Sequence, residues 1–152
     1  MLEVEIKAKI EIEPMKKRLG ELGAEFINRT HQKDVYFRHP CHDFKKSDEA
    51  LRVRKVEDNY FLTYKGEKLD PETKTRKEIQ IRVEKGVFNL LKNLGFSPIR
   101  EVEKWRSLYQ WKDLRIYLDE VKELGHKNYP YRNGARYRLR IKIFFQNLFR
   151  GI

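Results

Sequence analysis

The chain opens with Met1-Leu-Glu-Val-Glu-Ile-Lys-Ala-Lys-Ile-Glu-Ile12, in which apolar and charged side chains alternate. Because successive side chains of a β-strand point to opposite faces, this alternation predicts a strand with one apolar face and one charged face. A charged face of this kind is commonly a solvated outer surface. The sharper interpretation is that Glu3 and Glu5 hold a divalent cation while Lys7 meets an anion on the same face. Matching partners elsewhere in the chain decide between the two.

The composition predicts one folded domain over residues 1–152, since 39% of the residues are hydrophobic and 12% are aromatic. The net charge of +11 favours an anionic partner, such as a phosphate-rich small molecule, a nucleic acid or a membrane surface. Cys41 is the single cysteine, which excludes an internal disulfide and favours a reducing compartment. The sequence lacks an apolar run long enough for a signal sequence or a membrane span, so we expect a cytoplasmic protein without a membrane partner. Abundant Lys and Glu with few Gln are typical of a thermophile.

The C-terminal segment differs in composition from the rest of the chain. Residues 126–152 contain seven basic residues and no acidic residue, whereas residues 1–125 contain all 23 acidic residues. We therefore treat 126–152 as an atypical basic tail of the predicted domain.

The hydrophobic pattern predicts a second kind of element, the helix, at two places. Glu13-Pro14 begins one helix, in which Met15, Leu19 and Leu22 lie at helical spacing, and residues 86–94 form another. Beyond the first strand, further strands are expected at residues 25–38, 50–56, 60–65, 74–84, 102–111, 114–121 and 135–145. These elements predict an α+β domain built on a large antiparallel sheet. A sheet with this many strands and with charge along one face is expected to curl or close.

A polar loop at residues 39–48 carries His39-Pro-Cys41-His42. Histidine and cysteine are zinc ligands, but a structural zinc site needs four of them. Without a fourth partner at ligand spacing, the sequence disfavours a zinc site formed by this cluster.

Nearly every predicted strand carries charge on one face and apolar residues on the other. If the sheet closes with its apolar faces outward against the helices, the charged rows line a hydrophilic interior that must be neutralised. A bound polyanion with its metal ions would provide that balance, since Arg offers fork-shaped contacts and Lys offers point charges to phosphate oxygens. The basic members of these rows are Arg52, Arg54, Lys65, Arg76, Lys104 and Arg106.

Seven motifs occur in a fixed order along residues 1–125. They are Glu3-x-Glu5-x-Lys7, Gln32-x-Asp34-x-Tyr36-Phe37, Ala50-Leu51-Arg52-Val53-Arg54, Leu62-Thr63-Tyr64-Lys65-Gly66, Lys74-x-Arg76-x-Glu78, Lys104-x-Arg106-x-x-Tyr109 and Leu118-Asp119-Glu120-Val121-x-x-Leu124-Gly125. In this order they resemble the CYTH superfamily, the triphosphate tunnel metalloenzymes. The resemblance is nearest to the branch of class IV adenylyl cyclases and their archaeal relatives.

The resemblance implies a closed or nearly closed eight-stranded antiparallel β-barrel, the triphosphate tunnel, with flanking helices. It implies an enzyme that uses Mg²⁺ or Mn²⁺ to convert ATP to cyclic AMP and pyrophosphate, or to hydrolyse ATP or another triphosphate. The implied metal ligands are Glu3, Glu5 and Asp119. The implied catalytic residues are Lys7, Glu78 and Asp119. The implied triphosphate contacts are Lys7, Arg52, Arg54, Lys65, Arg76, Lys104 and Arg106.

The resemblance breaks after Gly125, where the family continues into a strand of the form Phe-Ile-Glu-Ile-Glu. This chain instead reads His126-Lys-Asn-Tyr-Pro-Tyr-Arg-Asn-Gly-Ala135. Codons for residues 129–134 read one base later can encode Ile-His-Ile-Glu-Met-Glu, so a frameshift and a divergent natural tail are both open. Without those acids, a non-catalytic binder of triphosphate or polyphosphate is an alternative. Nucleic-acid binding through the tail is a further, less favoured alternative. Whether the chain forms a homodimer is a separate question that the sequence leaves open.

Overall fold

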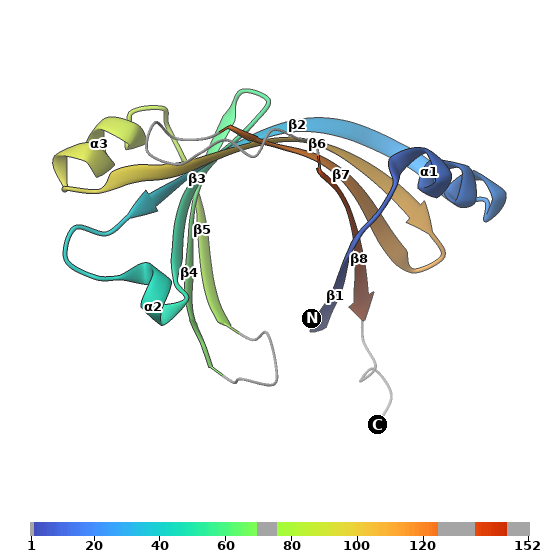
Figure 1. Cartoon of the computed structure of the whole chain (residues 1–152), viewed down its shortest axis with the longest axis horizontal. Helices are drawn as coiled ribbons and strands as arrows, with labels where there is room; N and C mark the ends of the chain where they lie inside the picture. The colour runs from blue at the N-terminus through green and yellow to red at the C-terminus, as the bar shows by residue number, and fades with distance from the viewer. Residues whose placement is uncertain (1, 70–75, 125–135, 146–152) are drawn as a thin grey trace. The chain divides into compact units, whose positions relative to one another are not determined.

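The computed structural model describes residues 2–69, 76–124 and 136–145 (Figure 1). The elements along this part of the chain are β1 (Leu2–Lys9), α1 (Ile12–Glu21), β2 (Glu25–Arg38), α2 (Phe44–Ser47), β3 (Ala50–Val56), β4 (Asn59–Lys68), β5 (Arg76–Val83), α3 (Val87–Asn93), β6 (Ser97–Trp111), β7 (Leu114–Leu124) and β8 (Arg136–Phe145). Within these residues, the helices are too short and too polar to cross a membrane.

The strands form one sheet in the order β1-β8-β7-β6-β2-β3-β4-β5. β8 pairs antiparallel with both β1 and β7, and the run from β2 to β5 is antiparallel throughout. The predicted antiparallel sheet with a few helices is therefore confirmed. The order is linear, with β1 and β5 at its two ends, so closure into a barrel stays a prediction.

Most of the expected elements form where the hydrophobic pattern placed them, and β2 and β3 have the predicted bounds. The first strand is shorter than predicted, because it ends at Lys9 and α1 begins at Ile12. Ile10 and Ile12 continue the apolar alternation in sequence, but they pack against the core that contains Leu19. Pro14 falls in the first turn of α1, where a missing backbone N–H removes no helical hydrogen bond.

The loop predicted at residues 39–48 contains a short helix, α2. Its cap is Asp43, whose carboxylate accepts hydrogen bonds from the backbone N–H groups of Lys45 at 3.0 Å and Lys46 at 3.4 Å. Asp48 ends the helix in the left-handed conformation, with φ of 55°. The turn brings the two ends of the loop together, so that His42 before the helix contacts Glu49 after it.

The strand predicted in the basic tail is confirmed as β8. It lies between β1 and β7 in the sheet. Its Phe145 is opposite Leu2 of β1, and its Ile143 is opposite Leu114 of β7. The change of composition after residue 125 therefore does not end the sheet.

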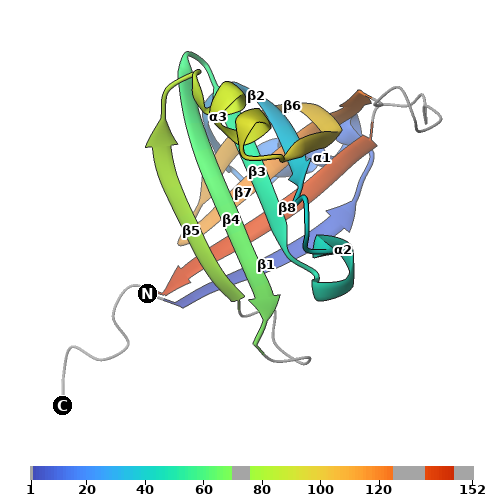
Figure 2. The ribbon, with the colours of Figure 1, turned by 90° about the vertical axis from the view of Figure 1, so that its left-hand side faces the viewer.

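The described chain divides into two compact units. The first unit contains the residues before Gln32, the segment Lys104–Lys122 and β8, and the second contains the described part of Gln32–Glu103. In the second unit α3 covers the apolar face of β2 and β3 (Figure 2), with a core of Phe37, Leu51, Val53, Val87 and Leu91.

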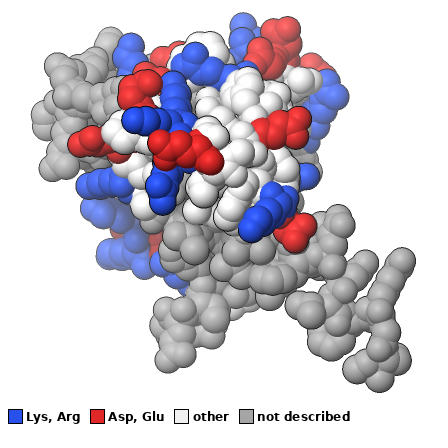
Figure 3. Space-filling view, turned by 90° about the vertical axis from the view of Figure 1, so that its right-hand side faces the viewer, with Lys and Arg blue, Asp and Glu red and all other residues white. Residues whose placement is uncertain are grey.

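In the first unit, α1 packs on the apolar face of β7. Leu19 of α1 is 2% exposed and packs with Ile116 and Leu118, and Leu139 and Ile141 of β8 border this core. On the side where α1 lies, basic and acidic side chains are interspersed around an uncharged area (Figure 3). The expected packing of the apolar strand faces against helices is therefore present in each unit.

We expect Leu118→Ala to lower the free energy of unfolding by about 2–5 kcal/mol, the usual cost of removing a buried leucine side chain. Leu118 is 1% exposed, so its removal leaves a cavity in the core of the first unit. Urea denaturation followed by circular dichroism measures the change. Leu90→Ala is the matched control, because Leu90 is 58% exposed and its truncation should cost about 0.5 kcal/mol or less. Equal losses in the two variants would contradict the assigned core.

Candidate functional site

The face of β3 opposite the core of the second unit is charged and yet buried. Leu51 and Val53 belong to the core, so Arg52 and Arg54 lie on the other face of the strand. Arg52 is 9% exposed, and the Thr63 side chain on the neighbouring strand β4 is 1% exposed. Charge in such a place has to be compensated by partners close by.

Asp34 of β2 provides that compensation. The pairing of β2 with β3 places Asp34 opposite Arg54, and the two side chains form a two-pronged ion pair. Arg54 Nε donates to Asp34 Oδ1 and Arg54 Nη2 donates to Asp34 Oδ2, each at 2.7 Å. Arg52 Nη1 lies 3.6 Å from Asp34 Oδ2. One carboxylate therefore faces two guanidinium groups.

Arg52 is incompletely paired within the described residues. Its Nη2 atom makes a long contact of 3.5 Å with Thr63 Oγ1, which itself donates to Gln80 Oε1 at 3.1 Å. Arg52 Nε and Gln32 Oε1 are both buried, and neither has a hydrogen-bond partner in this part of the chain. A buried cationic donor without a partner is a suitable contact for an anion.

Further cations on β4 and β5 have acidic partners that are more exposed. Lys65 Nζ lies 3.6 Å from Glu78 Oε2, as the pairing of the two strands places these residues opposite each other. Arg76 donates to the Asp48 backbone carbonyl and to its Oδ2 atom, each at 2.9 Å. A hydrogen bond from Lys68, and then the charge of Arg76, lower the pKa of the Asp48 carboxyl below its usual value.

The first unit has a buried ion pair of the same kind. Asp119 is fully buried, and Arg106 binds both of its oxygens, with Nε to Oδ1 at 2.6 Å and Nη2 to Oδ2 at 2.7 Å. The Arg106 guanidinium also lies 5.0 Å from the centre of the Tyr117 ring. Lys104, two residues before Arg106, is 5% exposed. This unit therefore also buries cations on the polar face of its strands.

The predicted site residues thus fall into several groups. Arg52 and Arg54 share the carboxylate of Asp34, Lys65 pairs with Glu78, and Arg106 pairs with Asp119. Lys104 is buried in the first unit, and Arg76 contacts Asp48. Glu3, Glu5 and Lys7 occupy alternate positions of β1, as expected, but their side chains lie outside the described part of the structure. The segment 126–135 also lies outside it, so the frameshift and the divergent tail both stay open.

Asp34 belongs to the motif Gln32-x-Asp34-x-Tyr36-Phe37, but it is not among the site residues predicted from the sequence. The signal was available, because Asp34 is the only acidic residue in the polar row of residues 32–38 and the next predicted strand carries two arginines. Register between strands was needed to see that Asp34 lies opposite Arg54.

A model of the CYTH domain matches residues 1–142 of the chain. The chain belongs to the CYTH family. A Methanocaldococcus jannaschii protein provisionally named an adenylate cyclase is 40% identical over 128 residues, which cover 82% of this chain and 73% of that protein. A Pyrococcus horikoshii protein of known structure is 35% identical with a TM-score of 0.74, and the match covers 97% of this chain and 80% of that one.

A Hippeastrum protein, provisionally named an adenylyl cyclase, is described as having a dominant triphosphatase activity. It is 17% identical to this chain, with a TM-score of 0.66 over 93% of this chain and 79% of that one, which supports the fold alone. The family resemblance inferred from the seven motifs is confirmed.

We expect Asp34→Asn to lower the free energy of unfolding by about 3–5 kcal/mol, because it removes the buried carboxylate charge that both guanidinium groups contact. Thermal or urea unfolding measures this loss. Glu101→Gln is the matched control, since the Glu101 pair with Lys33 is largely exposed and should contribute about 1 kcal/mol or less. A cost for Asp34→Asn no larger than that of the control would contradict the role assigned to Asp34.

Proposed function

We propose that this CYTH chain is a metal-dependent enzyme that acts on ATP or another triphosphate. The observation that carries the proposal is the incompletely paired guanidinium of Arg52, which is buried beside a carboxylate that Arg54 already holds. An anion with several oxygens would accept a hydrogen bond from the unpartnered Nε donor of Arg52. Membership of the CYTH family and the provisional naming of the Methanocaldococcus jannaschii relative as an adenylate cyclase support a triphosphate as that anion.

In this proposal the sheet closes into a tunnel, and its basic rows bind the phosphates. Arg52 contacts a phosphate through its free Nε donor, while Asp34 fixes the orientation of Arg54 through two hydrogen bonds. The remaining proposed phosphate contacts are Lys7, Lys65, Arg76, Lys104 and Arg106. The lysines provide adaptable point charges, and the arginines provide planar forks that match two phosphate oxygens.

The proposed metal ligands are Glu3, Glu5 and Asp119. Carboxylate oxygens are the ligands that Mg²⁺ and Mn²⁺ prefer, so the chemistry of this set fits either ion. When bound, the ion would polarise phosphoryl oxygens and neutralise developing negative charge. Asp119 can contribute only through lone pairs that Arg106 leaves available, because Arg106 occupies both of its oxygens. Glu3 and Glu5 therefore carry the larger share of the proposed metal binding.

Two reactions are compatible with this set of residues. In the cyclase reaction the ribose 3′-oxygen bonds to the α-phosphorus and pyrophosphate leaves. In the triphosphatase reaction a water oxygen bonds to the terminal phosphorus and ADP leaves. Each reaction requires an acceptor for the proton of the attacking oxygen, and we propose Glu78, whose side chain is 47% exposed and only loosely paired with Lys65. Lys7 would neutralise charge on the phosphates.

A non-catalytic triphosphate or polyphosphate binder is the second candidate. It is favoured by the pairing of both proposed catalytic acids with cations, Glu78 with Lys65 and Asp119 with Arg106. Such a protein would bind the anion without turnover.

We expect Arg52→Met to weaken the binding of inorganic tripolyphosphate about tenfold or more. A hydrogen bond to a charged group contributes about 1.5–3 kcal/mol, and about 1.4 kcal/mol corresponds to tenfold in affinity. Isothermal titration calorimetry measures the dissociation constant, and the fold should persist because Arg54 still neutralises Asp34. Arg18→Met, on the exposed side of α1, removes the same charge and is the control. Unchanged affinity in Arg52→Met would contradict the proposed site.

We expect the wild-type chain, incubated with ATP and Mn²⁺, to form either cyclic AMP with pyrophosphate or ADP with phosphate. Chromatography of the products identifies which reaction occurs. Glu78→Gln should lower the turnover about a hundredfold or more while the chain still binds ATP, because a positioned proton acceptor commonly contributes that much. Glu84→Gln is the control, because Glu84 is an exposed glutamate directly after β5, the strand that carries Glu78. Binding of ATP with no product in the wild type would instead favour the non-catalytic candidate.

A further inference from the structure

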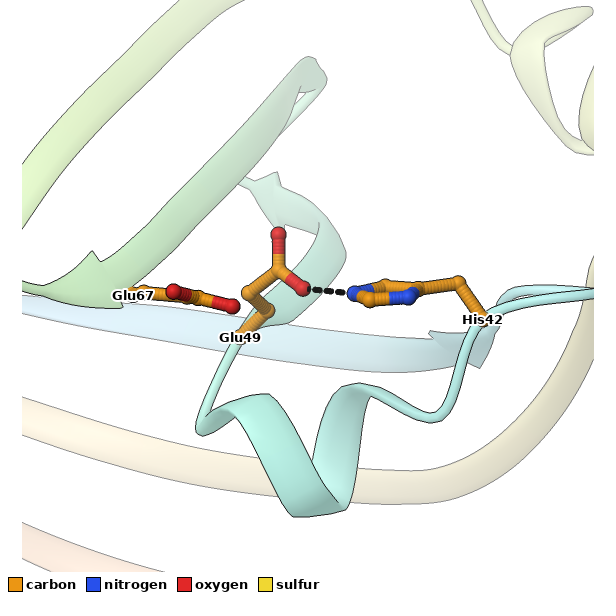
Figure 4. A group of neighbouring side chains, drawn as sticks. All are labelled: His42, Glu49 and Glu67. Atoms are coloured by element: carbon orange, nitrogen blue, oxygen red, sulfur yellow. Dashed lines mark hydrogen bonds and ion pairs between the residues drawn. The ribbon is translucent and has the colours of Figure 1, made fainter.

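The side chains of His42, Glu49 and Glu67 meet at one end of the second unit. His42 lies in the loop after β2, Glu49 directly precedes β3, and Glu67 lies near the end of β4. One ring nitrogen of His42 and one carboxylate oxygen from each glutamate all lie within 4.8 Å of one another. Figure 4 shows the Glu49 carboxylate between the His42 ring and the Glu67 carboxylate.

The backbone explains why the two glutamates are neighbours. Antiparallel pairing of β3 with β4 places Ala50 opposite Lys65, so Glu49 continues toward the end of β4 that carries Glu67. The register along β4 shifts between Lys65 and Lys68, as a β-bulge does, and a bulge re-aims the side chains it contains. Two carboxylates therefore converge from adjacent strands.

The short helix α2 brings His42 to the same place. Capping by Asp43 turns the loop back on itself, so that His42 Nε2 contacts Glu49 Oε2. The His42 ring lies edge-on to Phe44, with ring centres 5.6 Å apart, which helps to hold its orientation. His39 has a different role, because its Nδ1 accepts a hydrogen bond from the backbone N–H of Cys41 at 3.0 Å. The His39 and Phe44 rings pack against the His42 ring, while the Nε2 atom of His42 contacts the Glu49 carboxylate.

Glu49 is held in a fixed orientation by hydrogen bonds to both of its carboxylate oxygens. Ser47 Oγ donates to its Oε2 atom at 2.5 Å, and the Tyr64 hydroxyl donates to its Oε1 atom. The Glu49 side chain is only 10% exposed. Hydrogen bonds of this kind to a ligating carboxylate fix its orientation and tune its metal affinity.

We propose that His42, Glu49 and Glu67 bind one divalent transition-metal ion, with Zn²⁺ the best match. Imidazole nitrogens and carboxylate oxygens are both zinc ligands, and a site with three protein ligands keeps a fourth position open for water. Hard cations such as Mg²⁺ prefer oxygen ligands alone, so the nitrogen ligand distinguishes this site from the Mg²⁺ or Mn²⁺ site proposed above. Tetrahedral zinc ligands lie roughly 3.3 Å apart for bonds of about 2.0–2.1 Å, and the exposed Glu67 side chain can move to meet that spacing.

The ion would tie the loop after β2 to the end of β4. The site shares no residue with the proposed triphosphate site, so each can fail while the other holds. Lys65 of that site lies two residues before Glu67 on the same strand.

The test is a zinc titration of the metal-free, full-length chain by calorimetry, in millimolar Mg²⁺ to occupy sites made of oxygen ligands alone. We expect the wild type to bind one equivalent of Zn²⁺ at this site. His42→Gln and Glu67→Gln should each weaken that binding at least about tenfold. His39→Gln and Glu57→Gln are the matched controls, because each removes the same kind of side chain from outside the cluster, and both should bind Zn²⁺ within about threefold of the wild type.

A second measurement separates this site from non-specific zinc binding. Co²⁺ in place of Zn²⁺ should give the visible absorption of a four-coordinate site, and that absorption should be lost in His42→Gln but retained in His39→Gln. Circular dichroism checks that each variant is folded, and Glu67→Gln is the variant least prone to unfold because Glu67 is exposed. Wild-type zinc affinity in both His42→Gln and Glu67→Gln, or no zinc binding by the folded wild type, would overturn the proposal.

Discussion

The burial of charge on the polar face of the sheet is the constraint on which the rest of the structure depends. Asp34 and Asp119 are almost completely buried, and each binds an arginine through both of its oxygens. A single carboxylate or guanidinium in such a place would be strongly destabilising, so each pair must form for the strands to pack as they do. The apolar faces of the same strands are then free to pack against α1 and α3.

The two ion pairs differ in the further cations that lie near them. In the first unit, Arg106 and Asp119 neutralise each other, although buried Lys104 adds a further cation nearby in sequence. In the second unit, Asp34 faces both Arg54 and Arg52, and the Nε donor of Arg52 has no hydrogen-bond partner within the described residues. A buried cationic donor of this kind suits an anionic ligand, because binding adds a hydrogen bond without displacing an existing partner.

Much of this architecture could be predicted from the sequence, because period-two alternation specifies both the strands and the face that each residue occupies. Arg52 and Arg54 were placed correctly opposite the apolar row of Leu51 and Val53 on that basis. Pairing between strands was not predictable in the same way, since one sequence does not reveal register. The bond between Arg106 and Asp119 therefore went unforeseen, although both residues were selected. The closed barrel, the roles of Glu3, Glu5 and Lys7, the homodimer and the cytoplasmic location stay predictions.

The convergence of His42, Glu49 and Glu67 was beyond the sequence for a related reason. His42 was considered only with its neighbours in the loop, whereas its partners depend on α2, on the pairing of β3 with β4 and on the irregular register near Glu67. Four-residue helices and bulges carry weak sequence signals. A site that depends on them is therefore visible in a three-dimensional structure but not from sequence motifs.

The pairing of β1 with β8 has a consequence for how the molecule is made. Leu2 meets its partner Phe145 only after almost all of this sequence has been synthesised, and β8 is the neighbour of β1 in the strand order. Contacts between residues so far apart in the chain slow folding, because a long loop must close before they form. β1 is therefore expected to be among the last strands to complete its pairing, because its partner β8 lies far along the chain.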